Sequence, residues 1–161
     1  MANRLTLVAA LVIGVFSVFS SQSLAQTDPW IGTWKVDLAK STFSPGPKPT
    51  EAPVVKMEMM SGQFMTTING RNPQGQPTQT MTMGNFDGKD NVVTGAPVPG
   101  TTTAYKRIDT RTFETMSKVN GKPTTTTRVA ISADGKSLTA TVTGTNAQGQ
   151  TVNNVIVADK Q

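Results

Sequence analysis

The clearest structural signal in the chain is the stretch Trp30-Ile31-Gly32-Thr33-Trp34-Lys35-Val36-Asp37-Leu38. In an extended chain, Trp34, Val36 and Leu38 fall on one side, and the polar residues between them fall on the other. A period of two is typical of a β-strand with one buried face and one face in water. The stretch therefore predicts a half-buried strand near the start of the folded part of the chain.

The residues just before this strand indicate a turn. Asp28-Pro29 combines a residue that caps a first turn with one whose backbone is already set for it. We expect a turn that carries Trp30, followed by a strand that begins at Gly32. Glycine there permits a sharp bend or the close approach of another segment. On this pattern Trp34, on the apolar face of a strand, should contribute more to stability than Trp30.

Downstream, the chain is predicted to continue as short strands separated by turn sequences. Asn72-Pro73-Gln74-Gly75 and Asn120-Gly121 are strong turn signals. An Asp-Gly pair at 87–88 is likewise interpreted as a turn rather than a calcium loop, because the alternating acidic ligands are missing. The predicted strands are residues 54–60, 64–68, 78–83, 91–94, 101–108, 112–119, 122–131, 137–143 and 151–158.

Residues 39–53 should form an extended surface loop. The four prolines at positions 45, 47, 49 and 53 exclude a long helix. Phe43 is the one large apolar residue in this segment. Two roles for it remain open at this point, because it could plug the mouth of a barrel or only anchor the loop.

Nine or ten strands joined by hairpins form a meander, and an open meander would expose two long edges. Closing the sheet removes those edges, and the known solutions are up-and-down barrels of eight to ten strands. We therefore expect an all-β, up-and-down antiparallel β-barrel of eight to ten strands without lid helices.

Residues 1–25 have the features of a secretory signal peptide. Arg4 supplies the early positive charge, and residues 5–19 are apolar but too short for a comfortable membrane span. Ser23-Leu24-Ala25 is a small-x-small cleavage site. We expect cleavage after Ala25 and a single domain of residues 26–161 in the periplasm or outside the cell, with no stable membrane span after cleavage.

Composition excludes several classes of function. The chain has no His and no Cys. Nucleophilic systems that use those residues, zinc sites built on them and haem sites with a proximal His are therefore impossible. The basic residues are scattered rather than clustered with aromatics, so we expect no nucleic-acid binding. The remaining carboxylates show no recognisable catalytic pairing, so we expect no enzyme, no catalytic residues, no metal site and no cofactor.

Gly32-Thr33-Trp34 resembles the Gly-x-Trp signature that opens the first strand of lipocalins and fatty-acid-binding proteins (the calycin-type barrels). The chain as a whole resembles a group of small exported bacterial lipocalin-like proteins, which implies a barrel and export rather than an activity. In lipocalins a basic residue packs across the signature tryptophan, which implies that role for Lys160 or Arg128. The Arg-x-Tyr pair with which fatty-acid-binding proteins hold a carboxylate is absent. The segments that carry the wider resemblance are residues 30–35, 40–47, 87–90, 106–109, 120–122, 132–136 and 146–161.

The sequence leaves two functions open, which depend on whether the barrel interior is a cavity or a solid core. If the methionine faces of their strands point inward, thioethers and threonines would line an adaptable cavity for a small apolar or amphipathic molecule, carried by a monomer. Arg107 shares a face with Tyr105 and could pair with an anionic head group. If the methionines instead fill a solid core, the outer surface of an envelope or extracellular protein would carry the function. The candidate ligand-binding residues are Trp34, Met57, Met59, Phe64, Met81, Met83, Tyr105 and Arg107.

Overall fold

The computed structural model describes residues 28–161; the predicted signal peptide lies outside the described residues. All regular structure in residues 28–161 is β-strand, so no lid helix follows the first strand. The strands are β1 (Gly32–Thr42), β2 (Val54–Met60), β3 (Gln63–Arg71), β4 (Pro77–Gly84), β5 (Asn91–Val92), β6 (Thr101–Arg107), β7 (Thr112–Val119), β8 (Lys122–Ile131), β9 (Ser137–Thr145) and β10 (Thr151–Lys160).

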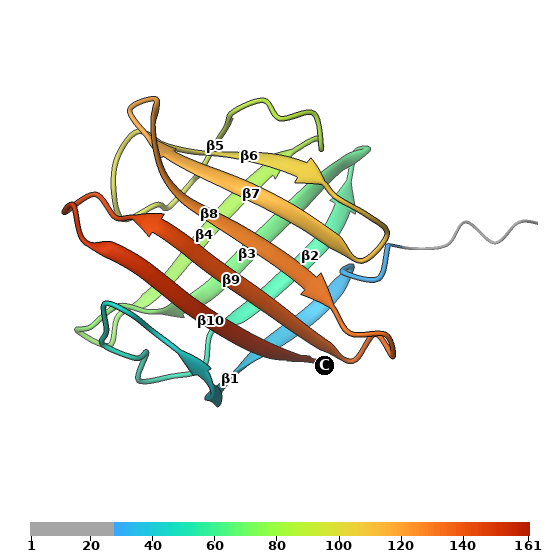
Figure 1. Ribbon diagram of the computed structural model, residues 1–161, viewed down its shortest axis with the longest axis horizontal. Coiled ribbons are helices and arrows are strands. Elements are labelled where there is room, and N and C mark those ends of the chain that lie inside the picture. The colour runs from blue at the N-terminus through green and yellow to red at the C-terminus, as the bar shows by residue number, and fades with distance from the viewer. Residues whose placement is uncertain (1–27) are drawn as a thin grey trace, which may run out of the picture.

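The ten strands form one antiparallel sheet that curls into a nearly closed barrel (Figure 1). The order across the sheet is β4-β3-β2-β1-β10-β9-β8-β7-β6-β5. Hydrogen-bonded neighbours are consecutive in the chain, except that β1 pairs with β10, with Trp34 opposite Lys160. The predicted all-β up-and-down barrel is confirmed.

The two edges of the sheet, β4 and β5, meet along a seam with little hydrogen bonding. Met81 and Thr94 exchange two backbone hydrogen bonds of 2.9 Å there. Nearby, the segment after β4 is held by a bridge between Asp87 and Lys106, and the Gly88 N–H donates to the Tyr105 carbonyl at 3.0 Å. The seam therefore closes the barrel at a few points rather than along a continuous ladder.

β1 runs four residues further than the alternation predicted, because Ser41 repairs an interruption in its pairing with β10. The register shifts between Asp37 and Thr42. The Ser41 hydroxyl donates to the Asp37 carbonyl at 2.6 Å and accepts the Val157 N–H at 2.9 Å. A side chain thus replaces a backbone partner in the ladder, and the bulged strand bends, as bulges generally make it do. The loop that follows spans residues 43–53 rather than 39–53.

The hydrophobic core consists mainly of side chains at inward strand positions, as the alternation of apolar and polar residues predicts. On the opening strand Trp34 and Val36 are buried, and on later strands Phe64, Phe113 and Leu138 occupy the same side of the sheet. Threonine fills many of the other strand positions, where a β-branched side chain suits a pleated, half-buried surface. This placement leaves few bulky groups for the middle of the barrel.

Candidate ligand cavity

A cavity of about 400 Å³ lies inside the barrel. Pockets of that size accept small organic ligands. Its larger lining side chains include those of Trp34, Met57, Tyr105, Phe113 and Leu138. The other apolar lining residues are Val36, Phe43, Pro53, Val55, Ile68, Val93, Ala96, Pro97, Val129, Ala140, Val142, Ile156 and Ala158.

A cluster of aromatic rings closes one end of this cavity. The Trp30 ring is fully buried, 5.3 Å from the Phe113 centroid and 5.8 Å from the Phe86 centroid. Phe64 contacts Phe86, Phe113 and Tyr105 with centroid separations of 5.0 to 5.5 Å. Tilted and edge-on contacts at such distances are favourable ring geometries. The aromatic plug (Trp30, Phe64, Phe86, Phe113 and Tyr105) therefore fills one end of the barrel.

Arg107 lies against the plug and does not line the cavity. Its guanidinium stacks 4.6 Å from the Trp30 centroid and 5.1 Å from that of Phe86. It donates two hydrogen bonds of 2.7 Å to the Asp28 carboxylate, which raises the pKa of the guanidinium further. Arg107 is therefore not part of the cavity lining, and its role toward an anionic head group stays a prediction. Although Arg107 shares a face with Tyr105, it lies two residues nearer the end of the strand.

Trp34 contacts both the turn that precedes β1 and the last strand, β10. Its indole N–H donates to the Trp30 carbonyl at 2.8 Å. The Lys160 ammonium lies 5.1 Å from the Trp34 ring centroid and donates to the Pro29 carbonyl at 3.3 Å. Lys160 therefore occupies the place that the lipocalin resemblance implied for a basic residue, whereas Arg128 pairs with Glu114.

Gly32 makes room for Lys160. Its φ of +141° is rarely adopted by residues with a side chain, and a Cβ there would lie 2.7 Å from the Lys160 Cε. The close approach expected at this glycine is confirmed. Together, Gly32 and Lys160 fix the end of β1 on which Trp34 stands.

Only part of the predicted set of ligand-binding residues reaches the cavity. Trp34, Met57 and Tyr105 line it, whereas Phe64 is buried in the aromatic plug. The other candidates besides Arg107 are three methionines, and none of them lines the cavity.

The prediction that Met59, Met81 and Met83 line the interior is wrong. Met81 and Met83 are 38% and 41% exposed, because on β4 the threonines at positions 80 and 82 point inward. Side chains alternate along a strand, so the methionines must then point outward. Met59 shares a face with Met57 but lies near the end of β2 and is 53% exposed.

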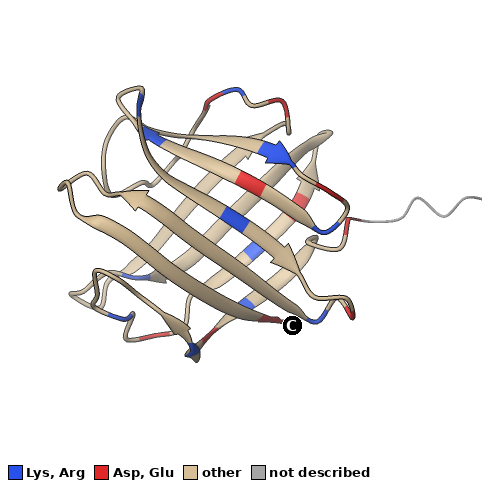
Figure 2. Ribbon diagram, viewed as in Figure 1, with Lys and Arg blue, Asp and Glu red and all other residues tan. Residues whose placement is uncertain are grey.

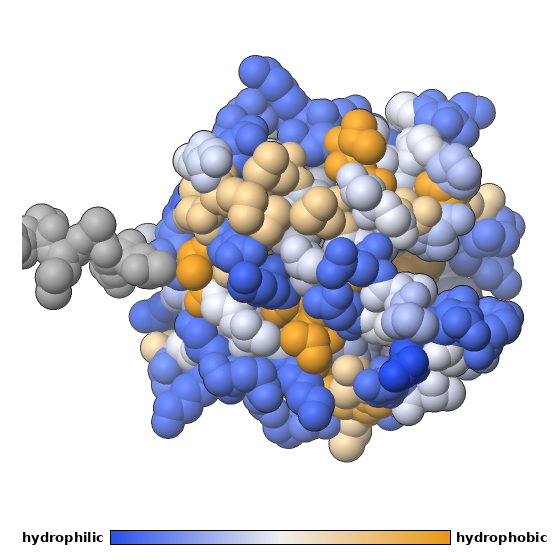
Figure 3. All heavy atoms as spheres, turned by 180° about the vertical axis from the view of Figure 1, so that it is seen from behind, coloured by the Kyte–Doolittle hydropathy of each residue, from blue (hydrophilic) through white to orange (hydrophobic). Residues whose placement is uncertain are grey.

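The outward methionines form part of an apolar patch at the seam. Met60, Met81 and Met83 surround the buried Met65, with Val92 beside them. Figure 3 shows apolar side chains gathered on this side of the barrel, among polar ones.

Hydroxyl groups supply the polar lining of the cavity. Among residues 28–161, Tyr105 is the one titratable side chain that lines the cavity. Burial raises the pKa of its phenol, although hydrogen bonds with Thr66 and Thr82 partly offset that effect. The phenol therefore stays neutral at physiological pH. The remaining hydroxyl-bearing lining residues are Thr80, Thr101, Thr103, Thr115, Ser117 and Thr127.

Apart from Tyr105, the sequence prediction missed the lining residues of β6 to β10 and of two loops. Thr103 on β6 and Thr115 on β7 face inward, two positions from Tyr105 and Phe113. Because side chains alternate along a strand, counting in steps of two from Tyr105 and Phe113 would have identified both threonines. Phe43 lines the cavity as well, so this side chain reaches the barrel interior from the loop after β1.

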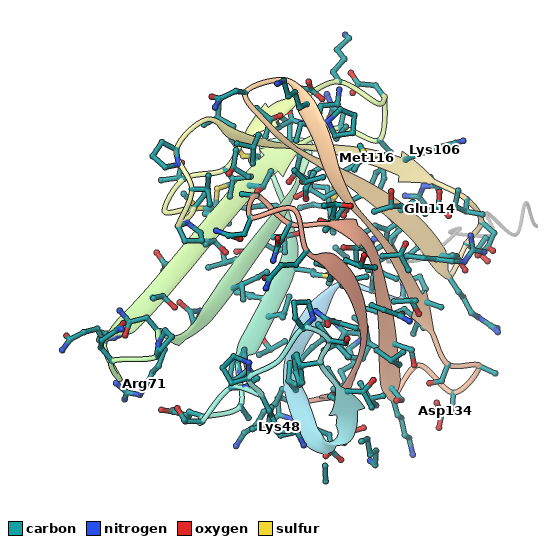
Figure 4. All side chains as sticks on the ribbon, turned by 60° about the vertical axis from the view of Figure 1, so that its left-hand side comes forward. Lys48, Arg71, Lys106, Glu114, Met116 and Asp134 are labelled. Atoms are coloured by element: carbon teal, nitrogen blue, oxygen red, sulfur yellow. The ribbon has the colours of Figure 1, made fainter. Side chains whose placement is uncertain are left out.

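Charged residues lie mainly in the turns and loops at the two ends of the barrel, with a few at positions along the strands (Figure 2). Glu114 pairs with Arg128 on the outer face, and Figure 4 shows Glu114 and Met116 pointing away from the interior. Within residues 28–161, no group of three Asp or Glu residues could hold a metal ion, and no helix could span a membrane.

No protein-family model matches the chain, and no curated protein matches it. Its fold is similar to that of the solved structure of zebrafish ileal bile acid-binding protein in complex with cholic acid. The TM-score is 0.50, with 14% identity, over 83% of this chain and 99% of that chain. At this identity the likeness shows the fold alone. Within residues 28–161, the barrel contains its cavity without lid helices.

Proposed function

We propose that the protein is a non-catalytic carrier, active as a monomer, that holds one small apolar or amphipathic molecule inside the barrel. The observation that carries this proposal is the cavity of about 400 Å³, lined mainly by apolar side chains and closed at one end by the aromatic plug. Burying the apolar surface of a ligand there is favourable by about 25 cal/mol per Å². The similarity to a barrel whose solved structure contains cholic acid agrees with this use of the fold.

The alternative from the sequence, an envelope or extracellular protein with a solid barrel, requires a filled interior. The inward side chains of β6 to β8 are largely threonine and serine, which leave the middle of the barrel open. The cavity therefore favours the carrier over the solid barrel.

The direct test of the carrier is titration of the mature protein with N-phenyl-1-naphthylamine, an uncharged apolar probe that fluoresces when it leaves water. We expect saturable binding of one probe per chain, together with a retained small molecule in native mass spectrometry of protein purified from its own host. Absence of saturable probe binding and of any retained molecule would reject the carrier.

Export is a separate part of the proposal, and it rests on the signal sequence of residues 1–25. We expect N-terminal sequencing of exported protein to begin at Gln26, directly before the described barrel. A product that begins at Met1, or inside β1, would contradict cleavage after Ala25.

A further inference from the structure

We propose that the cavity selects an uncharged ligand and discriminates against anionic molecules of the same shape. This inference rests on the proposed carrier function and names the class of its ligand. The proposal rests on the observation that, within residues 28–161, no Asp, Glu, Lys or Arg lines the cavity. The polar side chains that line it carry hydroxyl groups, above all the neutral Tyr105 phenol with Thr66 and Thr82, which can donate to or accept from an alcohol, an ester or a ketone.

A carboxylate that entered this cavity would lose its water and gain no opposite charge. Burial of an unpaired charge disfavours the charged form and raises the pKa of a carboxyl group. The guanidinium nearest to the aromatic plug, that of Arg107, is already paired with Asp28 by two hydrogen bonds of 2.7 Å. The rings of Trp30 and Phe86 lie directly against it.

Two cations near the opposite end of the barrel are also engaged. Arg71, at the tip of the β3–β4 hairpin in Figure 4, pairs with Glu51 and donates to the Gly75 carbonyl. Lys118 lies 2.8 Å from the Asp90 carboxylate. An anionic head group beside either of these two cations would therefore compete with an existing partner, whereas a hydroxyl needs no cation.

The test compares 1-decanol with decanoate as competitors for bound N-phenyl-1-naphthylamine at pH 7.5. The two competitors have the same carbon chain and differ in charge. We expect decanoate to displace the probe at least about tenfold more weakly than 1-decanol, because burial shifts the pKa of a carboxyl group by a unit or more. Lowering the pH to 5.5 should narrow the gap, since a carboxylic acid with a pKa near 4 to 5 is then protonated roughly a hundredfold more often. 1-Decanol at pH 5.5 controls for changes in the protein.

A matched pair of variants introduces one lysine on either face of β4. Thr80→Lys adds a charge to the cavity wall on β4, whereas Met81→Lys adds the same charge to the outer face next to it. We expect Thr80→Lys to strengthen decanoate binding at least about tenfold relative to Met81→Lys, because an opposite charge nearby favours the ionised carboxyl.

The outcomes separate the two proposals. If decanoate competes as well as 1-decanol in the wild type, or if neither competes with bound probe, the selection of uncharged ligands is overturned while the carrier stands. If the probe shows no saturable binding and native mass spectrometry finds no retained molecule, the carrier fails, and the inference fails with it.

Discussion

Replacing Thr115 with tryptophan is expected to weaken binding of N-phenyl-1-naphthylamine at least about tenfold, a loss of about 1.4 kcal/mol. Thr115 lies on β7 opposite Thr127 and Tyr105, and all three side chains line the cavity. An indole at this position would occupy space that the ligand needs. Because that space is empty, we expect the free energy of unfolding to change by less than the 1–3 kcal/mol that overpacking a solid core typically costs.

The matched control is Met116→Trp, which places the same ring one residue away on the outer face, where Met116 is exposed. It should keep the affinity of the wild type. Met83→Trp should do the same, since Met83 also points outward. Weaker binding in Met83→Trp but not in Thr115→Trp would show that the probe binds the methionine patch at the seam, and the cavity would lose its main support.

Trp30→Ala and Trp34→Ala are each expected to lower the free energy of unfolding by about 3–5 kcal/mol, the usual range for a buried aromatic residue. Both rings are fully buried. The expectation from the sequence that Trp30 contributes less, because it lies in a turn, does not fit its packing against Phe86 and Phe113.

Phenylalanine variants separate the two tryptophans. The Trp34 indole N–H bonds to the Trp30 carbonyl at 2.8 Å, whereas the buried Trp30 N–H has no hydrogen-bond partner within residues 28–161. Trp34→Phe leaves a carbonyl unpaired, at a cost of about 1–3 kcal/mol, while Trp30→Phe removes an unsatisfied donor. Urea denaturation should therefore find Trp34→Phe less stable than Trp30→Phe. The reverse order would contradict this assignment of hydrogen bonds.

The fold could be predicted from the sequence because alternation and turn chemistry are local. Trp34 and Val36 define an inward face without knowledge of any other strand, and Asn120-Gly121 specifies a two-residue hairpin, where both residues have positive φ. Ser41 was not foreseen, since its role depends on Val157, a residue distant in sequence that the pairing of β1 with β10 brings alongside.

The candidate site was predicted less well because the face of a threonine–methionine strand cannot be decided from its own residues. On β4, either Thr80 and Thr82 or Met81 and Met83 could point inward, and hydrophobicity favoured the methionines. The choice was made by pairing with β3, where Thr82 lies opposite Thr66 and Met83 opposite Met65. On β3 the buried Phe64 points into the barrel, so Thr66 points inward as well and Met65 points to the other face.

The pairing of β1 with β10 means that the covalent connections and the hydrogen-bonded ladders of this barrel do not coincide. β4 and β5 are consecutive in the chain, yet they form the two opposite edges of the sheet. β1 and β10 lie at opposite ends of the described chain, yet they are hydrogen-bonded neighbours. Beside them, the Gln161 N–H donates to the Thr33 carbonyl at 2.9 Å. A circular permutant of residues 28–161, joined by a short linker from Gln161 to Asp28 and opened between β4 and β5, would run from one edge of the sheet to the other. Each ladder between neighbouring strands would then join consecutive strands, so the pairing of β1 with β10 would become local and its loop-closure entropy would fall. Only the few contacts across the seam, such as the bridge between Met81 and Thr94, would become distant in sequence. The same barrel thus allows a second chain order of lower contact order.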